Sequence, residues 1–199
     1  MVQPTERCHV VAVPYPGRGH INPMLNLCRL IASRRADILI TFVVTEEWLG
    51  FLGSESKPAT VSFCAIPNVI PSELVRAHDF PGFVEAVMTK MEAPVERLLA
   101  RLKPPASLMI CDTLLTWVVE LGNRRSIPVA SFWPMSATVF SMYYHFDLLV
   151  QNGHHPTNLS GKFVKAKCIA LFFIRTMLDL SCHALTQLYL TKVQLMLYM

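Results

Sequence analysis

The chain has 199 residues, which is enough for one substantial hydrophobic core and at most one complete domain with part of another. Apolar residues make up 52% of the sequence, yet every apolar run is interrupted well short of the roughly 18 residues that a membrane-spanning helix needs. The net charge of +4 comes from scattered basic residues, which gives no support to nucleic-acid binding.

The six cysteines form no closely spaced pair of the kind that binds zinc. We therefore expect reduced thiols and no metal site. The polar start of the chain, residues 1–7, leads directly into an apolar run and lacks the hydrophobic centre of a secretory signal. The sequence thus predicts a cytoplasmic protein without a membrane span.

Short apolar runs alternate with longer segments of helical periodicity in the first three quarters of the chain. The runs are continuously apolar, which is typical of strands covered on both faces of a parallel sheet. The predicted strands are residues 8–13, 38–45, 61–66, 107–111 and 127–132. The predicted helices are residues 21–35, 80–102, 114–125 and 136–151. This order predicts an α/β fold with a doubly wound, mainly parallel, Rossmann-like sheet.

Two prolines lie within these predicted helices. We expect Pro23 in the first turn of the first helix, where its missing N–H has no partner to lose. Pro94 is expected to kink the helix predicted over residues 80–102.

The last segment, residues 162–199, has a different composition. It is rich in Leu, Met and Phe and contains neither Gly nor Pro. Three interpretations remain open: an amphipathic helical pair, an interfacial membrane segment, or residues outside the fold. We expect residues 1–161 to form the Rossmann-like domain and residues 162–199 to be an atypical hydrophobic tail.

The loop after the first predicted strand has the sequence VPYPGRGHINPM. It resembles a phosphate-binding turn, but Asn22 stands where the dinucleotide fingerprint would have its third glycine. Gly17 and Gly19 still permit a tight turn with the backbone close to a ligand. His20 falls near the start of the first helix, where the helix dipole disfavours the imidazolium form. His20 is therefore a candidate proton acceptor.

Asp112 ends the fourth predicted strand, at the same edge of the sheet as the His20 loop. A carboxylate that accepts the imidazole N–H would fix the tautomer of the ring and stabilise its cation. Two simpler roles are a histidine bonded to backbone and an aspartate that caps the next helix, and capping can coexist with pairing. Since no Gly-x-Ser-x-Gly nucleophile accompanies the pair, it suits deprotonation of a bound hydroxyl.

Two stretches resemble the amino-terminal half of plant family 1 UDP-dependent glycosyltransferases. They read HVVAVPYPGRGHINPMLNLCRLIASR and LMICDTLLTWVVELGNRRSIPVASFWPMSATVFSMYYH, and the resemblance covers roughly residues 7–160. It implies the amino-terminal, acceptor-binding half of a two-domain GT-B fold. It also implies that His20 is the general base and Asp112 its partner, in an inverting, metal-free transfer of sugar from a UDP-sugar to a hydroxyl of a hydrophobic, flavonoid-like or terpenoid-like molecule.

The sequence lacks the Trp-x-Pro-Gln and His-Cys-Gly-Trp-Asn-Ser elements of the family's carboxy-terminal donor domain. We therefore expect a truncated chain without a cofactor and with most of the UDP-sugar site missing, so that UDP-sugar binds only if a donor domain is supplied. Such a chain would be inactive alone, because proximity of donor and acceptor supplies much of the rate. The alternative is a noncatalytic remnant that binds acceptor or a full-length relative.

Five residues are predicted to contact the acceptor. Apolar side chains just beyond the fifth strand could line an apolar pocket, although aromatic residues at helical spacing more often belong to a core. The predicted contacts are Gly19, Trp133, Met135, Phe140 and Tyr143.

Overall fold

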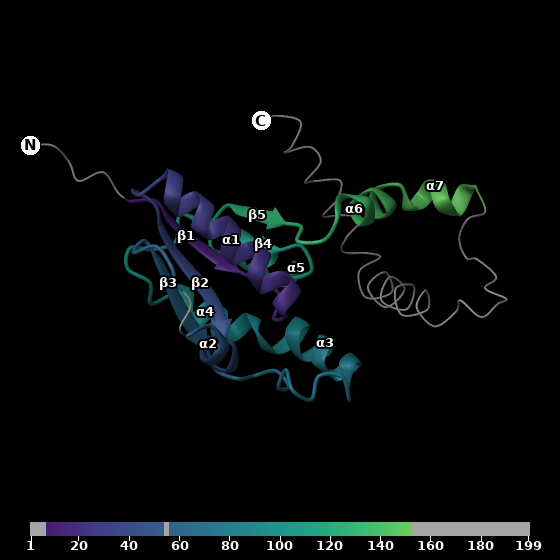
Figure 1. Ribbon diagram of the computed structural model, residues 1–199, viewed down its shortest axis with the longest axis horizontal. Coiled ribbons are helices and arrows are strands. Elements are labelled where there is room, and N and C mark those ends of the chain that lie inside the picture. Colours follow the sequence, from purple (N-terminus) through teal and green to yellow (C-terminus); the bar gives the residue numbers. More distant parts are fainter. Residues whose placement is uncertain (1–6, 54–55, 153–199) are drawn as a thin grey trace, which may run out of the picture. The chain divides into compact units, whose positions relative to one another are not determined.

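The computed structural model describes residues 7–53 and 56–152. The chain divides into two compact units, with the boundary between Ser136 and Ala137. The first unit holds a parallel sheet with the strand order β3-β2-β1-β4-β5 (Figure 1). Its strands are β1 (His9–Val13), β2 (Leu39–Thr45), β3 (Val61–Ile66), β4 (Leu108–Asp112) and β5 (Val129–Phe132). The doubly wound, Rossmann-like sheet predicted from the sequence is therefore confirmed.

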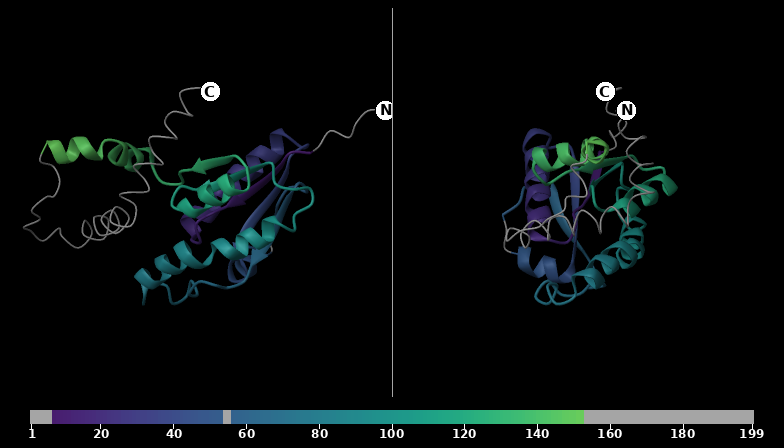
Figure 2. Two further views of the ribbon diagram at one scale, coloured as in Figure 1. Left: turned by 180° about the vertical axis from the view of Figure 1, so that it is seen from behind. Right: turned by 90° about the vertical axis from the view of Figure 1, so that its right-hand side faces the viewer.

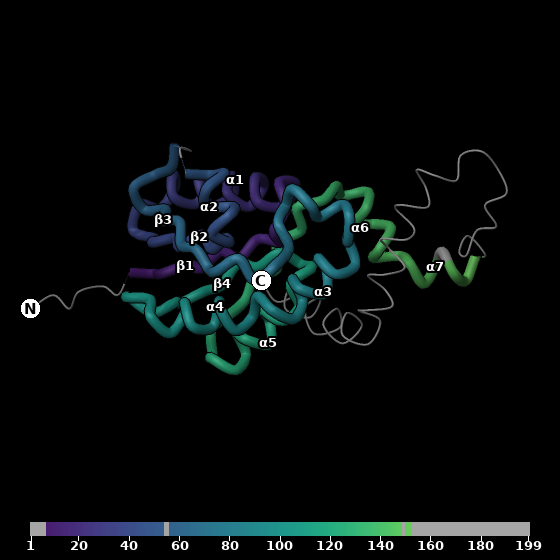
Figure 3. The backbone as a smooth tube through the Cα atoms, turned by 90° about the horizontal axis from the view of Figure 1, so that it is seen from below, coloured from purple at the N-terminus to yellow at the C-terminus, as the bar shows by residue number. Residues whose placement is uncertain are grey.

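Helices cover both faces of this sheet. They are α1 (Arg18–Arg34), α2 (Glu46–Leu52), α3 (Phe80–Lys90), α4 (Glu92–Leu99) and α5 (Thr116–Arg124). Figure 3 shows α1 and α2 on one side of the strands and α4 and α5 on the other, and the right-hand view of Figure 2 agrees. The cover explains the apolar strands, since all five residues of β1 are buried.

The core is formed where α1 packs on the sheet. The buried side of α1 carries residues at helical spacing: Ile21, Met24, Leu25, Cys28 and Ala32. They join Phe42 and other strand residues in one hydrophobic cluster. This packing fixes the direction of α1 and hence the position of its first turn.

The structure differs from the sequence-based expectation at two prolines, Pro23 of α1 and Pro94 of α4. Because α1 begins at Arg18, Pro23 lies in its second turn, where the missing N–H leaves the Gly19 carbonyl without its usual i+4 donor. The helix predicted over residues 80–102 is interrupted at Met91, between α3 and α4. The interruption precedes Pro94 because the proline ring conflicts with a carbonyl one turn earlier.

Helix α2 was not predicted from the sequence. It is only seven residues long, so its apolar residues form no recognisable period. Its start is nevertheless well specified, because the Thr45 side chain accepts a hydrogen bond from the Trp48 N–H at 3.3 Å. Glu46 and Glu47 add negative charge to the first turn, where the helix dipole favours it.

Gly122 allows α5 to lie very close to the strand that follows it. A Cβ at this position would lie 2.2 Å from Val129 Cγ2 and 2.9 Å from the Ile127 carbonyl oxygen. No other residue fits there without a shift of β5 or α5.

In the second unit the structure describes α6 (Ala137–Tyr144) and α7 (Phe146–Gln151). The sequence predicts one helix over residues 136–151, and the structure has a break at His145. The predicted domain boundary after residue 161 and the predicted tail, residues 162–199, lie outside the described residues. Within the described ranges, no helix is long and apolar enough to cross a membrane.

Candidate active site

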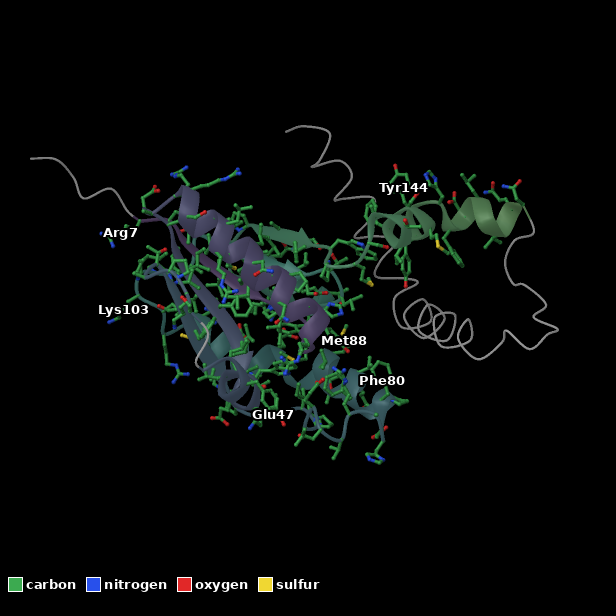
Figure 4. All side chains as sticks on the ribbon, in the orientation of Figure 1. Arg7, Glu47, Phe80, Met88, Lys103 and Tyr144 are labelled. Atoms are coloured by element: carbon green, nitrogen blue, oxygen red, sulfur yellow. The ribbon has the colours of Figure 1, made fainter. Side chains whose placement is uncertain are left out.

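The candidate site lies at the carboxyl edge of the sheet. Parallel pairing aligns Val13 of β1 with Cys111 of β4, and Asp112 with Phe132 of β5. The last residues of three neighbouring strands therefore reach the same edge. Figure 4 shows the opposite, amino-terminal end of the sheet at Arg7 and Lys103, far from Phe80. Ligands of open α/β sheets bind at the carboxyl edge.

His20 is presented by the turn between β1 and α1. Gly17, in extended backbone, precedes the helix, and its carbonyl oxygen accepts the N–H groups of His20 and Ile21, each at 2.9 Å. His20 is thus the third residue of α1 and lies in its first turn. Residue 20 is held by the helix rather than by a free loop.

His20 and Asp112 form a hydrogen-bonded pair. The distance from His20 Nδ1 to Asp112 Oδ2 is 2.7 Å, and the His20 side chain is 20% exposed whereas Asp112 is fully buried. The other carboxylate oxygen, Oδ1, accepts the Leu114 N–H at 3.0 Å. The aspartate therefore holds the loop after β4 as well as the imidazole.

The geometry has a direct chemical consequence. A carboxylate only accepts hydrogen bonds, so a neutral His20 carries its proton on Nδ1 and keeps a lone pair on Nε2. Nε2 can take a proton from a ligand hydroxyl, and Asp112 would stabilise the imidazolium that forms. Within the described residues, no group of three potential metal ligands is present.

Tyr15 lies against the histidine. Its ring centroid is 5.1 Å from that of His20 and 6.2 Å from that of Phe83. The hydroxyl is buried and has no hydrogen-bond partner in the described part of the chain. Burial raises the pKa of Tyr15 well above its usual range, an effect that the Arg76 charge opposes and the Asp112 charge reinforces. The phenol is therefore a buried, protonated neighbour of the imidazole.

Three of the predicted acceptor contacts belong to the unit that contains His20. Gly19 lies in the first turn of α1, and a Cβ there would meet nothing within 4 Å. Trp133 and Met135 follow β5 and are half-buried. The Trp133 indole N–H donates to the Ser136 carbonyl at 3.3 Å, which holds the ring close to the start of the following segment.

Phe140 and Tyr143 belong to α6, in the second unit. Phe140 is exposed, and burial raises the pKa of the half-buried Tyr143. The structure therefore brings His20 and Asp112 together and places Gly19 beside them. The acceptor role of Phe140 and Tyr143 stays a prediction.

Sequence reasoning gave no role to Tyr15 or Arg76. Tyr15 was visible, because it stands inside the turn motif five residues before His20. Arg76 lies in the long segment between β3 and α3, and its Nη1 is 3.5 Å from the Pro16 carbonyl oxygen. Nothing in the sequence near Arg76 indicates that contact.

The family match and the similar proteins indicate the same protein family. Residues 6–49 match the family described as "Glycosyltransferase, N-terminal domain". The chain is 55% identical over 152 residues to UDP-glycosyltransferase 87A2 of Arabidopsis thaliana, which covers 76% of this chain and 33% of the relative. It is 32% identical over 165 residues to 7-deoxyloganetin glucosyltransferase of Gardenia jasminoides, with 76% and 34% coverage. The chain thus spans about a third of the length of these relatives.

Solved structures with the same fold include a UDP-glucose: anthocyanidin 3-O-glucosyltransferase in complex with UDP. The TM-score is 0.61 at 22% identity, and the match covers 80% of this chain and 37% of that one. A second is Os79 from O. sativa in complex with U2F and trichothecene, with a TM-score of 0.57, 22% identity and coverage of 68% and 31%. At this level of identity the likeness concerns the fold.

Proposed function

Because this chain belongs to the plant UDP-glycosyltransferase family, we propose that it contributes the acceptor half of a sugar transfer from a UDP-sugar to a hydroxyl of a hydrophobic small molecule. His20 is the general base and Asp112 its partner. The observation that carries this proposal is the 2.7 Å hydrogen bond between His20 Nδ1 and the buried Asp112 carboxylate, with the ring still partly open to solvent.

In the proposed reaction, His20 Nε2 takes the proton of the acceptor hydroxyl. The oxygen forms a bond to the anomeric carbon of the sugar while the bond from that carbon to UDP breaks, which inverts the configuration. Asp112 stabilises the imidazolium through Nδ1, and a proton is later lost to solvent. General-base catalysis of this kind typically contributes about 10²- to 10⁴-fold in rate.

Acceptor binding involves the open surface beside the first turn of α1. Gly19 precedes His20 and has open space where a side chain would stand, which supports a contact between an acceptor and the backbone there. Trp133 and Met135 follow the strand next to Asp112 and supply apolar surface. The acceptor contacts predicted from the sequence for Phe140 and Tyr143, which belong to the second unit, stay predictions. A relative that is 32% identical is named for acting on 7-deoxyloganetin, which supports a hydroxylated terpenoid-like acceptor.

The test is incubation of the chain with UDP-glucose and a panel of phenols and terpenoid alcohols, with product measured by mass spectrometry. Turnover that falls at least about 100-fold in His20→Ala and Asp112→Ala supports the assignment. His78→Ala is a suitable control, because His78 is exposed and lies outside the pair. Turnover that survives in His20→Ala would overturn the role of the histidine.

The second function is the alternative left open by the sequence, in which the acceptor half has a binding role. In this case the chain binds the acceptor without transferring sugar. Calorimetric titration with the same panel separates the two outcomes. Acceptor binding without turnover in the unmodified chain supports the binding function, and turnover supports the transferase.

A further inference from the structure

The segment between β3 and α3, residues 67–79, contacts the turn that presents His20. Arg76 makes this contact: its Nη1 lies 3.5 Å from the Pro16 carbonyl oxygen. A Cβ at Gly17 would lie 3.3 Å from the same Nη1 and 3.8 Å from His20 Cδ2. The guanidinium and the imidazole thus both lie close to one point in the turn.

A second line of contacts joins Arg76 to the histidine through aromatic rings. The guanidinium carbon is 5.3 Å from the centroid of the Phe83 ring. Phe83 meets Tyr15 edge to face, and Tyr15 lies tilted against His20 at 5.1 Å between centroids. A guanidinium held over an aromatic face restrains that ring by cation–π attraction. Arg76 is therefore linked indirectly to the imidazole in two ways, through the backbone turn and through the aromatic ring contacts.

Arg76 is itself held in place. Its Nη1 lies 2.9 Å from Glu73 Oε2, and the pair is only about a quarter exposed. The preceding residues are tied to the start of α2, because Glu47 accepts the Ser72 hydroxyl at 2.5 Å and the Glu73 N–H at 3.0 Å. The guanidinium is therefore linked to α2 as well as to its own segment.

We propose that Arg76 is a positioning residue for His20. Asp112 holds one edge of the imidazole, but a single hydrogen bond does not stop the ring from rotating about it. Arg76 restrains the remaining freedom by holding the turn at Pro16 and by restraining the Phe83 ring, which contacts the Tyr15 ring that lies against the imidazole. An arginine suits this role, since its planar fork can pair with a carboxylate, a carbonyl and an aromatic face at once, which a lysine cannot.

This inference rests on the proposed function of His20, yet it can be tested without activity. The readout is the ratio of the Nδ1–H to the Nε2–H tautomer of His20 in the full chain, from the imidazole ¹⁵N chemical shifts at a pH where the ring is neutral. The His20→Gln spectrum identifies the His20 signals. In Arg76→Gln this ratio is expected to fall by about tenfold, because loss of one charge-assisted contact changes an equilibrium by that order.

The matched control is Arg124→Gln. Arg124 also pairs with a glutamate, Glu92, but this pair joins α5 to α4. Arg124→Gln is expected to leave the His20 ratio unchanged, and an equal change in both variants would show that any lost ion pair has this effect and would overturn the proposal. An unchanged ratio in folded Arg76→Gln would overturn it as well.

Should Arg76→Gln fail to fold, Arg76→Lys decides the question. Lysine keeps the ion pair with Glu73 and loses the planar contacts, so the ratio should fall less than tenfold but measurably. A ratio equal to that of the unmodified chain would refute the positioning role. If the tautomer changes while His20→Ala leaves turnover intact, the base assignment fails and the positioning role stands.

Discussion

Replacing Asp112 by asparagine removes a buried carboxylate that accepts two hydrogen bonds, and an amide can keep both contacts only if the His20 tautomer changes. If the amide oxygen faces His20, the amide nitrogen faces the Leu114 N–H, and two donors meet. If the amide is turned over, its nitrogen faces His20 Nδ1, and the ring must carry its proton on Nε2. Hydrogen bonds to charged groups contribute about 1.5–3 kcal/mol each and neutral ones about 0.5–1.5 kcal/mol, and Asp112 makes two. Because the amide replaces two charged hydrogen bonds by two neutral ones, we expect Asp112→Asn to lower the free energy of unfolding by about 2 kcal/mol.

Two measurements check this expectation. Urea unfolding gives the free energy, with Asp147→Asn as the control at an exposed position, where a change within about 0.5 kcal/mol is expected. Imidazole ¹⁵N shifts give the tautomer of His20, which should move toward Nε2–H. A loss below about 1 kcal/mol together with a proton retained on Nδ1 would show that the carboxylate does not hold the ring.

Three further predictions concern packing and charge in the first unit. Gly122→Ala should lower the free energy of unfolding in urea by at least about 2 kcal/mol, because a Cβ at residue 122 has no room. Gly19→Ala should raise this free energy by up to about 1 kcal/mol, because a Cβ at residue 19 lies in open space. Equal effects of the two substitutions would contradict the packing. The Arg35 hydrogen bond lowers the pKa of Asp37 to about 2, so the stabilisation from Asp37 is present above about pH 4 and is lost as the pH falls through 2. In an NMR titration, Arg35→Gln should raise this pKa, although a backbone hydrogen bond still lowers it, and no change would refute the pairing. Tyr15→Phe removes a buried hydroxyl without a partner in the described residues and should raise the unfolding free energy by up to about 1 kcal/mol; a loss would reveal a partner.

The sequence was most informative where residues are buried in regular elements. The five strands were predicted within two residues, because strands covered on both faces leave continuous apolar runs such as that of β1. The meeting of His20 and Asp112 followed from topology, since neighbouring parallel strands end at the same edge. Their catalytic role stays a prediction, because proximity alone does not establish chemistry.

The parts that were not predicted depend on contacts between distant segments or on short elements. The contact of Arg76 with the turn depends on the path of residues 67–79, which have no hydrophobic period to indicate it. Helix α2 is too short for its period to be recognised. The start of α1 was placed too late, because a proline was taken to mark the first turn although Pro23 lies in the second.

The pairing of His20 with Asp112 depends only on elements of the first unit. β1 and β4 are adjacent in the sheet, α1 is packed on it through its buried face, and the Asp112 carboxylate is fixed by the Leu114 N–H. The pairing is therefore a property of the first unit itself. The tautomer of His20 in the full chain reports directly whether this pairing holds, independently of any turnover.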